Sequence, residues 1–407
     1  MKRAMCLVAC ALLLLWPAHC ANASEAEAEE PAQQQEQTQQ QAEEEFEWQL
    51  SQTLSGLQLG ELESHYQQDE LAKSILGGAN LRTLIESAAR GESTFDVLDI
   101  LKALGGRFVN ALRGNLLLLL QLVVLAVLMS LIGAVGPDVL SGEVSNVCRF
   151  IGYVMVMALC VQSLVSVFQI GIQAITSMTG VMQAIFPVML TLLTAIGSSA
   201  TVGVFQPAMT LLTGSIVTLI QRFSLPAILT SGILVIVQHV SGKVQIEQTT
   251  KLVMKCAQWL TTVVFVIFLG VTALQGLAGA TYDGISIRTA KFAIDKFVPI
   301  VGGMFSDTVD TLVGCSLVVK QGVGIVGLLL LACSIASPVL QIAAMSITYR
   351  LAAAIIEPFG DKKLPACLSG LASVFTLLYI AVLAAGIMMF ILTTLLIRAG
   401  NVNVMLR

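Results

Sequence analysis

Charged residues are scarce in this chain. Only 12% of its 407 residues are charged and 56% are hydrophobic, whereas a soluble globular protein carries roughly a quarter charged residues. No Lys or Arg occurs between Arg3 and Lys73, a stretch that holds 13 of the 26 acidic residues. From Lys73 onward there are 20 basic and 13 acidic residues, a net charge of +7. The composition excludes an ordinary soluble domain, and a mildly basic membrane region indicates cytoplasmic loops and lipid headgroups, not nucleic acid.

The chain also lacks the residue patterns of catalytic and metal sites. Its nine cysteines include no CxxC pair, and no Cys/His cluster has metal-ligand spacing. The three histidines lie apart, at His19, His65 and His239, and no nucleophile, zinc-protease or phosphate-loop motif occurs. We therefore predict no catalytic, cofactor-binding or metal-binding residues and no bound cofactor.

Residues 1–23 have the three parts of a secretory signal peptide. Two basic residues, Lys2 and Arg3, precede a short apolar stretch over residues 4–16, and Ala21 and Ala23 form a small-residue cleavage site. This order predicts cleavage before Ser24. An uncleaved signal anchor is the alternative.

Two segments precede the first long apolar run. Residues 24–56 are acidic and rich in Glu and Gln, and this composition predicts a disordered segment. In residues 57–113 apolar residues recur at roughly helical spacing among charges, with breaks at Gly77-Gly78 and Arg90-Gly91. We expect a small head of short amphipathic helices there, outside the cytoplasm, packed on itself or lying along the membrane surface.

Uncharged intervals predict the membrane helices, because a charge at the middle of a bilayer costs about 2.5–3.5 kcal/mol or more. Residues 150–221 hold no charge over 72 positions, which gives room for three crossings of about 20 residues each, with turns at Gly180 and Gly197. The expected helices are residues 116–136, 150–172, 181–197, 204–220, 223–242, 256–282, 321–349 and 364–397. With a further ambiguous segment, residues 114–407 form a polytopic all-α membrane domain with seven to nine membrane helices.

The ambiguous segment, residues 297–319, is apolar but interrupted by Pro299, Asp307 and Asp310. It is either a broken or re-entrant segment buried in protein or a crossing that lines a cavity. Asp307 and Asp310 share one helix face at i, i+3. They either line an aqueous path within the membrane or, in the case of Asp307, cap a helix. Pro187 and Pro299 are candidate helix breaks, since proline in a helix interior removes one backbone hydrogen bond.

Prolines spaced 112 residues apart (Pro187 with Pro299, Pro226 with Pro338) suggest an internal repeat of residues 116–220 and 225–347, although chance explains two pairs equally well. The basic loops give mixed signals about orientation under the positive-inside rule. An insertase or a partner protein would then help to set the topology.

Several stretches resemble the stage III sporulation protein AE family, multipass membrane proteins of endospore-forming bacteria. The resemblance covers about residue 57 to the C-terminus and is most specific over residues 288–310. The residues that carry it are Ile185-Phe186-Pro187, Phe205-Gln206-Pro207-Ala208, 288–303 and 306–310.

The resemblance implies a protein that is not an enzyme and that resides in the membrane of the mother cell around the engulfed forespore. It implies partners among the other membrane proteins of the stage III sporulation A operon and in stage II sporulation protein Q from the forespore side, together a channel-like or secretion-like complex. The alternative function is a stand-alone permease for a small molecule or ion, which the repeat and the Asp307/Asp310 pair would suit.

Overall fold

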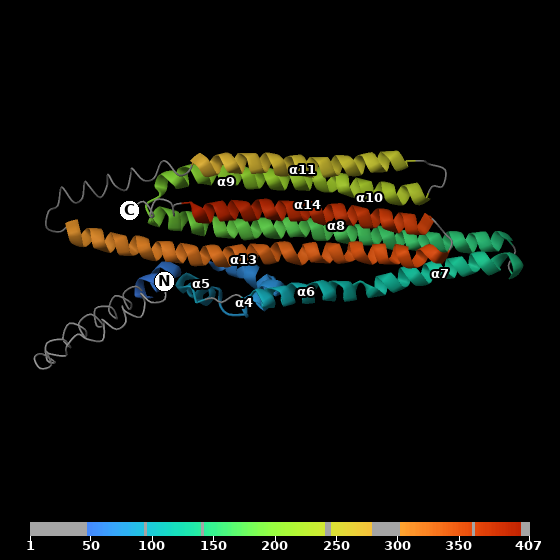
Figure 1. Ribbon diagram of the computed structural model, residues 1–407, viewed down its shortest axis with the longest axis horizontal. Coiled ribbons are helices and arrows are strands. Elements are labelled where there is room, and N and C mark those ends of the chain that lie inside the picture. Colours follow the sequence, from blue (N-terminus) through green and yellow to red (C-terminus); the bar gives the residue numbers. More distant parts are fainter. Residues whose placement is uncertain are drawn as a thin grey trace, which may run out of the picture. The chain divides into compact units, whose positions relative to one another are not determined.

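The computed structural model describes residues 47–92, 96–139, 142–240, 246–278, 302–359 and 363–399. The chain divides into two compact units, Met1–Gln52 and Thr53–Arg407, and of the first unit only residues 47–52, which are helical, are described. The predicted signal peptide and the Glu/Gln-rich residues up to 46 lie outside the described residues. Every regular element in the described ranges is helical (Figure 1), which confirms the all-α polytopic fold class.

The second unit begins with the short amphipathic helices that the sequence predicts. They are α3 (Gly60–Gln68), α4 (Glu70–Leu76) and α5 (Leu81–Arg90). Asp69 caps α4, because its carboxylate Oδ1 accepts hydrogen bonds from the amides of Leu71 (3.0 Å) and Ala72 (3.2 Å). Gly77 and Gly91 end α4 and α5 with φ angles of 73° and 74°, a left-handed conformation that glycine adopts without a steric penalty. The predicted breaks at both positions are confirmed.

These short helices pack on the long helices of the same unit. α5 contacts α13 (Gly302–Ile356), and α3 contacts α8 (Gly142–Ala195). A Cβ atom on Gly322 of α13 would lie 2.5 Å from the carbonyl oxygen of Ile85 and 3.0 Å from the Cβ of Ala89. The two backbones approach this closely because Gly322 has no side chain. Residues 57–113 are therefore not a compact body of their own.

α6 (Val97–Gly114) and α7 (Leu116–Val139) follow each other with one residue, Asn115, between them. Arg107 connects α6 to α13 and α4. Its Nε donates to Ser337 Oγ on α13 (3.3 Å), and its guanidinium forms an ion pair with Glu70 of α4 (3.2 Å). The first predicted membrane helix, residues 116–136, lies within α7.

α8 is a single helix of 54 residues, where the sequence predicts two helices separated by a turn at Gly180. This prediction is wrong, because Gly180 lies inside α8 and faces α3: a Cβ atom there would lie 2.6 Å from the His65 ring. The glycine thus permits a close helix contact and is not a turn. At 1.5 Å per residue α8 and the 55-residue α13 are each about 80 Å long, more than twice the roughly 30 Å of a bilayer core.

α9 (Ser199–Leu219) and α10 (Leu225–Val240) also join into one helical run, although the sequence predicts separate helices at residues 204–220 and 223–242. A π-helical turn, Ile220–Ser224, connects them, and the Leu225 amide donates to the carbonyl of Ile220. A π turn changes the local backbone bonding just before Pro226, which has no amide hydrogen to donate. The turn predicted at Gly197 is confirmed, with a φ angle of 84° between α8 and α9.

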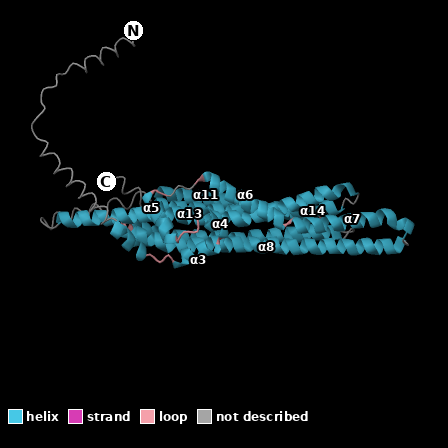
Figure 2. Cartoon of the chain, turned by 90° about the horizontal axis from the view of Figure 1, so that it is seen from below, coloured by secondary structure: helices cyan, strands magenta, loops and turns pink. Residues whose placement is uncertain are grey.

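α11 (Glu247–Ala278) and α14 (Lys363–Arg398) complete the described bundle. α8, α13 and α14 contact one another and run lengthwise side by side (Figures 1 and 2). Many side chains of α14, from Leu364 to Leu396, are buried. Six helices in the described ranges are long and apolar enough to cross a membrane. This number is below the predicted seven to nine because α8 and the α9–α10 run are each continuous. The first residues of the ambiguous segment, 297–301, which include Pro299, lie outside the described residues.

Candidate functional site

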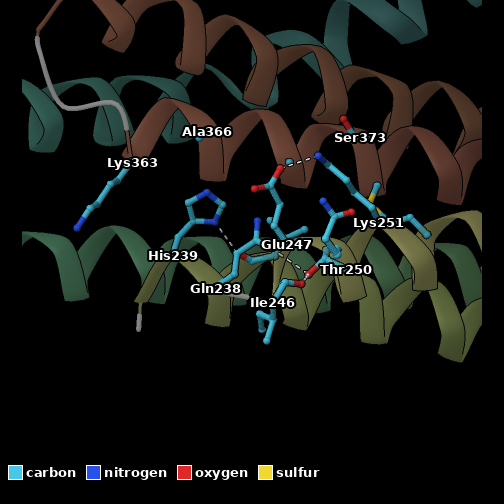
Figure 3. A pocket seen from close by; sticks show the side chains of 13 residues that line it. Gln238, His239, Ile246, Glu247, Thr250, Lys251, Lys363, Ala366 and Ser373 are labelled. Atoms are coloured by element: carbon cyan, nitrogen blue, oxygen red, sulfur yellow. Dashed lines mark hydrogen bonds and ion pairs between the residues drawn. The ribbon is translucent and has the colours of Figure 1, made fainter. Parts of the chain in front are cut away.

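A polar cavity of about 840 Å³ opens where α10 ends and where α11 and α14 begin (Figure 3). Apolar side chains such as Val235 and Met254 line it together with the polar ones. The polar side chains that line it are Gln238, His239, Gln248, Glu247, Thr250, Lys251, Lys363 and Ser373. Two consecutive helices, α10 and α11, and the distant α14 thus bring one set of polar groups to one end of the bundle.

Hydrogen bonds hold several of these side chains in place. Lys251 Nζ pairs with Glu247 Oε1 at 2.6 Å, one helical turn away on α11. Thr250 Oγ1 donates to Gln238 Oε1 at 3.0 Å and so joins the start of α11 to the end of α10. His239 Nδ1 donates to the carbonyl of Val235 at 2.7 Å, which directs its other ring nitrogen away from the backbone of α10.

The cavity carries more basic than acidic groups, because His239, Lys251 and Lys363 line it beside a single carboxylate, Glu247. The N-terminal ends of α11 and α14 add partial positive charge at the same place. Such a cavity suits a polar or anionic group at a membrane surface. The side chains that line it include no nucleophile paired with a base, and in the described ranges no three His, Cys, Asp or Glu residues gather as a metal site requires.

The sequence does not reveal this cavity. Nothing in the sequence relates Lys363 to His239, because their proximity depends on how α14 packs beside α10 and α11. The one signal for the cavity in the sequence is the cluster of lysines near the start of α11.

The structure places Asp307 and Asp310 on α13, and their side chains lie outside the described residues. α13 begins at Gly302, five residues before Asp307, whereas an N-cap residue immediately precedes the first helical turn. Asp307 is therefore not the N-cap of α13. A role for either carboxylate in an aqueous path stays a prediction.

Lys320, further along α13, is fully buried. Its Nζ donates to the carbonyl of Ala399 just after α14, where the last carbonyls of a helix lack intrahelical partners. A lysine at this place both satisfies one carbonyl and opposes the negative end of the helix dipole.

The structure shows no interruption of α8 at Pro187, contrary to the predicted helix break. The helix continues to Ala195, Pro187 is exposed, and its neighbours Ile185 and Met189 are buried. Because a proline removes only one hydrogen bond of the helix, packing on both sides keeps the helix continuous. Pro299 lies outside the described residues, so a break there stays a prediction.

The outward face of α8 changes character along the helix. Up to Val161 its exposed side chains include large apolar ones such as Phe150, Ile151 and Val154, as a lipid-facing helix requires. Beyond that point the exposed residues are mostly amides and hydroxyls. They are Gln162, Ser166, Gln169, Gln173, Thr176, Ser177, Gln183, Thr191 and Thr194. The sequence shows this pattern but not that it faces outward.

A second polar feature adjoins this face. A groove of about 340 Å³ between α8 and α9 is lined by side chains that include Thr179, Gln183, Thr210 and Thr213. At its end Gln221 Nε2 donates to Thr176 Oγ1 at 3.4 Å. The polar face of α8 therefore continues onto α9 without any charged residue from position 150 to 221.

Comparison with known proteins agrees with the resemblance seen in the sequence. The family described as "Stage III sporulation protein AE (spore_III_AE)" matches residues 79–400, a range that begins later than the residue 57 expected. The stage III sporulation protein AE of Bacillus subtilis (strain 168) is 31% identical over 317 residues, which are 78% of this chain and 79% of that protein. No solved structure matches. The chain belongs to the stage III sporulation protein AE family, and with six long apolar helices in the part that the structure describes it is a multipass membrane protein of sporulation stage III.

Proposed function

We propose that this protein is a membrane component of a multiprotein channel-like or secretion-like complex that acts between mother cell and forespore during endospore formation. The observation that carries the proposal is the outward face of α8 from Gln162 to Thr194, which is polar but bears no charge.

Neither lipid nor bulk water suits this face. Amide side chains such as Gln169 and Gln173 are costly against hydrocarbon unless they find hydrogen-bond partners. A water-exposed protein surface carries about a quarter to a third charged residues, yet 72 consecutive residues here carry none. A face of this kind fits an enclosed polar lumen or a contact with another membrane protein.

The proposed setting follows the family. The complex would lie in the mother-cell membrane around the forespore, and its other members would be membrane proteins of the stage III sporulation A operon and stage II sporulation protein Q. With a cleaved signal peptide the head lies outside the cytoplasm, and the three long apolar helical runs that precede the cavity, an odd number of crossings, would place His239 and Lys251 on the cytoplasmic side, where lysines near membrane helices are expected.

A stand-alone permease is less well supported. Such a protein binds its solute with polar groups near the middle of the membrane, enclosed by its own helices. In the described part of the chain the core is apolar, and the fully buried charged side chain is Lys320, which binds the end of α14.

Affinity purification from sporulating cells tests the proposal. We expect the tagged full-length protein, extracted in mild detergent at stage III, to co-purify with other sporulation membrane proteins. An unrelated tagged multipass protein from the same cells is the control. If the protein purifies alone and moves a solute by itself in proteoliposomes, the permease function replaces the proposed one.

A further inference from the structure

The basic cavity at the ends of α10, α11 and α14 lies at the level where the uncharged parts of two helices begin. Lys255 of α11 is followed by positions 256–282 without a charge, and Lys363 of α14 is followed by positions 364–397 without a charge. Trp259, one helical turn after Lys255, is 68% exposed, and tryptophan is enriched where a membrane meets water. The cavity therefore lies at the boundary between water and lipid.

A groove continues from this cavity along the same two helices. Met254 of α11 and Ser373 of α14 line the cavity. Gln258 and Leu377, each four residues further on, line a groove of about 250 Å³. Residues four apart lie one above the other on a helix face, so the groove begins one helical turn beyond the cavity. Its other lining residues are Thr261, Thr262, Phe265, Ile380, Leu383, Ala384 and Ile387.

This groove suits a hydrocarbon chain. The hydroxyls of Thr261 and Thr262 donate to backbone carbonyls one turn back on α11, at 3.0 and 2.9 Å, so neither hydroxyl proton is directed into the groove. Ile380 is 43% exposed, which shows that the groove opens outward. From Leu377 to Ile387 the groove is about 15 Å long at 1.5 Å per residue, half of the roughly 30 Å hydrocarbon core of a bilayer. Its length thus matches one leaflet.

The cavity selects the charge of the group at the head of such a chain. His239, Lys251 and Lys363 line it beside the single carboxylate of Glu247 (Figure 3). Lys251 pairs with Glu247, but an ammonium group has three donors and can also bind a phosphate oxygen. The N-terminal ends of α11 and α14 add partial positive charge. Basic pockets between membrane helices bind the phosphates of anionic lipid headgroups.

We propose that the cavity and the groove together bind one anionic glycerophospholipid. Its phosphate contacts Lys251 and Lys363, and one acyl chain lies in the groove between α11 and α14. A free phosphate makes no use of the groove, and an acidic protein segment has no chain to place in it. The lipid site goes beyond the proposed function, because a membrane protein can hold a lipid there whether or not it joins a complex.

Native mass spectrometry of the full-length, delipidated protein in detergent tests the headgroup. Phosphatidylglycerol should bind about tenfold more tightly than phosphatidylethanolamine with the same acyl chains, because only the first carries a net negative charge. Lys251→Gln with Lys363→Gln should weaken phosphatidylglycerol binding about thirtyfold. Lys102→Gln with Lys255→Gln is the charge-matched control, because both lysines are exposed and neither lines the cavity. The control should change binding by no more than about twofold.

A second variant tests the groove and leaves every charge in place. Ala384→Phe fills the groove and should weaken phosphatidylglycerol binding about tenfold. Ala354→Phe, at an exposed alanine of α13, is the matched control and should leave binding unchanged. A single symmetric peak in size-exclusion chromatography shows that each variant has folded. If the double lysine variant does not fold, Lys363→Gln alone should weaken binding about fivefold.

The other possible occupants are separate outcomes. Equal binding of the two lipids, or unchanged binding after the cavity lysines are replaced, overturns the anionic lipid. Displacement of phosphatidylglycerol by inorganic phosphate, with unchanged binding in Ala384→Phe, assigns the cavity to a free phosphate instead. A Glu-rich peptide that binds where phosphatidylglycerol does not assigns the cavity to a protein partner. Selective binding that both the lysine variant and Ala384→Phe weaken supports the lipid site.

Discussion

Replacing Gly322 by alanine is the sharpest test of how the short N-terminal helices dock on the bundle. The added Cβ atom would lie 2.5 Å from the carbonyl oxygen of Ile85, 3.0 Å from the Cβ of Ala89 and 3.1 Å from the Ala89 amide nitrogen. Two of these three atoms belong to the backbone of α5, so no side-chain rotation relieves the clash. α5 must move away from α13 as a unit.

The magnitude follows from the steric clash. Overpacking of this kind costs about 1–3 kcal/mol. The gain in helix propensity from glycine to alanine, about 0.5–1 kcal/mol, acts on α13 whether or not α5 is docked, so it does not offset this loss. Since exchange of docked amides proceeds through local opening, a loss of about 1–3 kcal/mol in the docked state of α5 should accelerate exchange about five- to 150-fold.

Hydrogen exchange of the full-length protein in lipid nanodiscs measures this effect, with the amides of α11 as the internal reference. Gly314→Ala is the matched control, because it lies on the same helix and a Cβ atom there meets nothing within 4 Å. That variant should leave exchange in α5 unchanged. Equal exchange in α5 for the two variants would refute docking through Gly322.

Three further predictions concern other parts of the chain. The mature protein should begin at Ser24, and an intact mass that retains residues 1–23 would contradict the signal peptide. Asp307→Asn with Asp310→Asn should impair sporulation at normal protein abundance if the carboxylates line an aqueous path; full sporulation of this double variant would remove that hypothesis. Lys320→Met removes the donor to the Ala399 carbonyl and leaves that helix end unsatisfied, which should cost about 1–3 kcal/mol. Faster proteolysis at the C-terminal end of α14 would show the loss, and protection equal to that of the unaltered protein would contradict the cap.

Some features of this fold follow from local sequence. Long intervals without charge can only be apolar helices when the chain meets a bilayer, because every backbone amide must find a partner within its own segment. Gly77, Gly91 and Gly197 mark the ends of helices because the left-handed backbone at these turns suits glycine. These effects act over a few residues, so the sequence alone determines them.

Other features depend on neighbours that the sequence does not reveal. Gly180 and Pro187 look like breaks in isolation, yet α8 runs through both, because α3 fills the space beside Gly180 and packing on either side stabilises the helix at Pro187. The same holds for the cavity beside His239 and Lys363, which exists only where α10, α11 and α14 meet. The glutamines of α8 are visible in the sequence, but only the tertiary structure decides that they face outward, since that depends on which side of α8 is buried against α13 and α14.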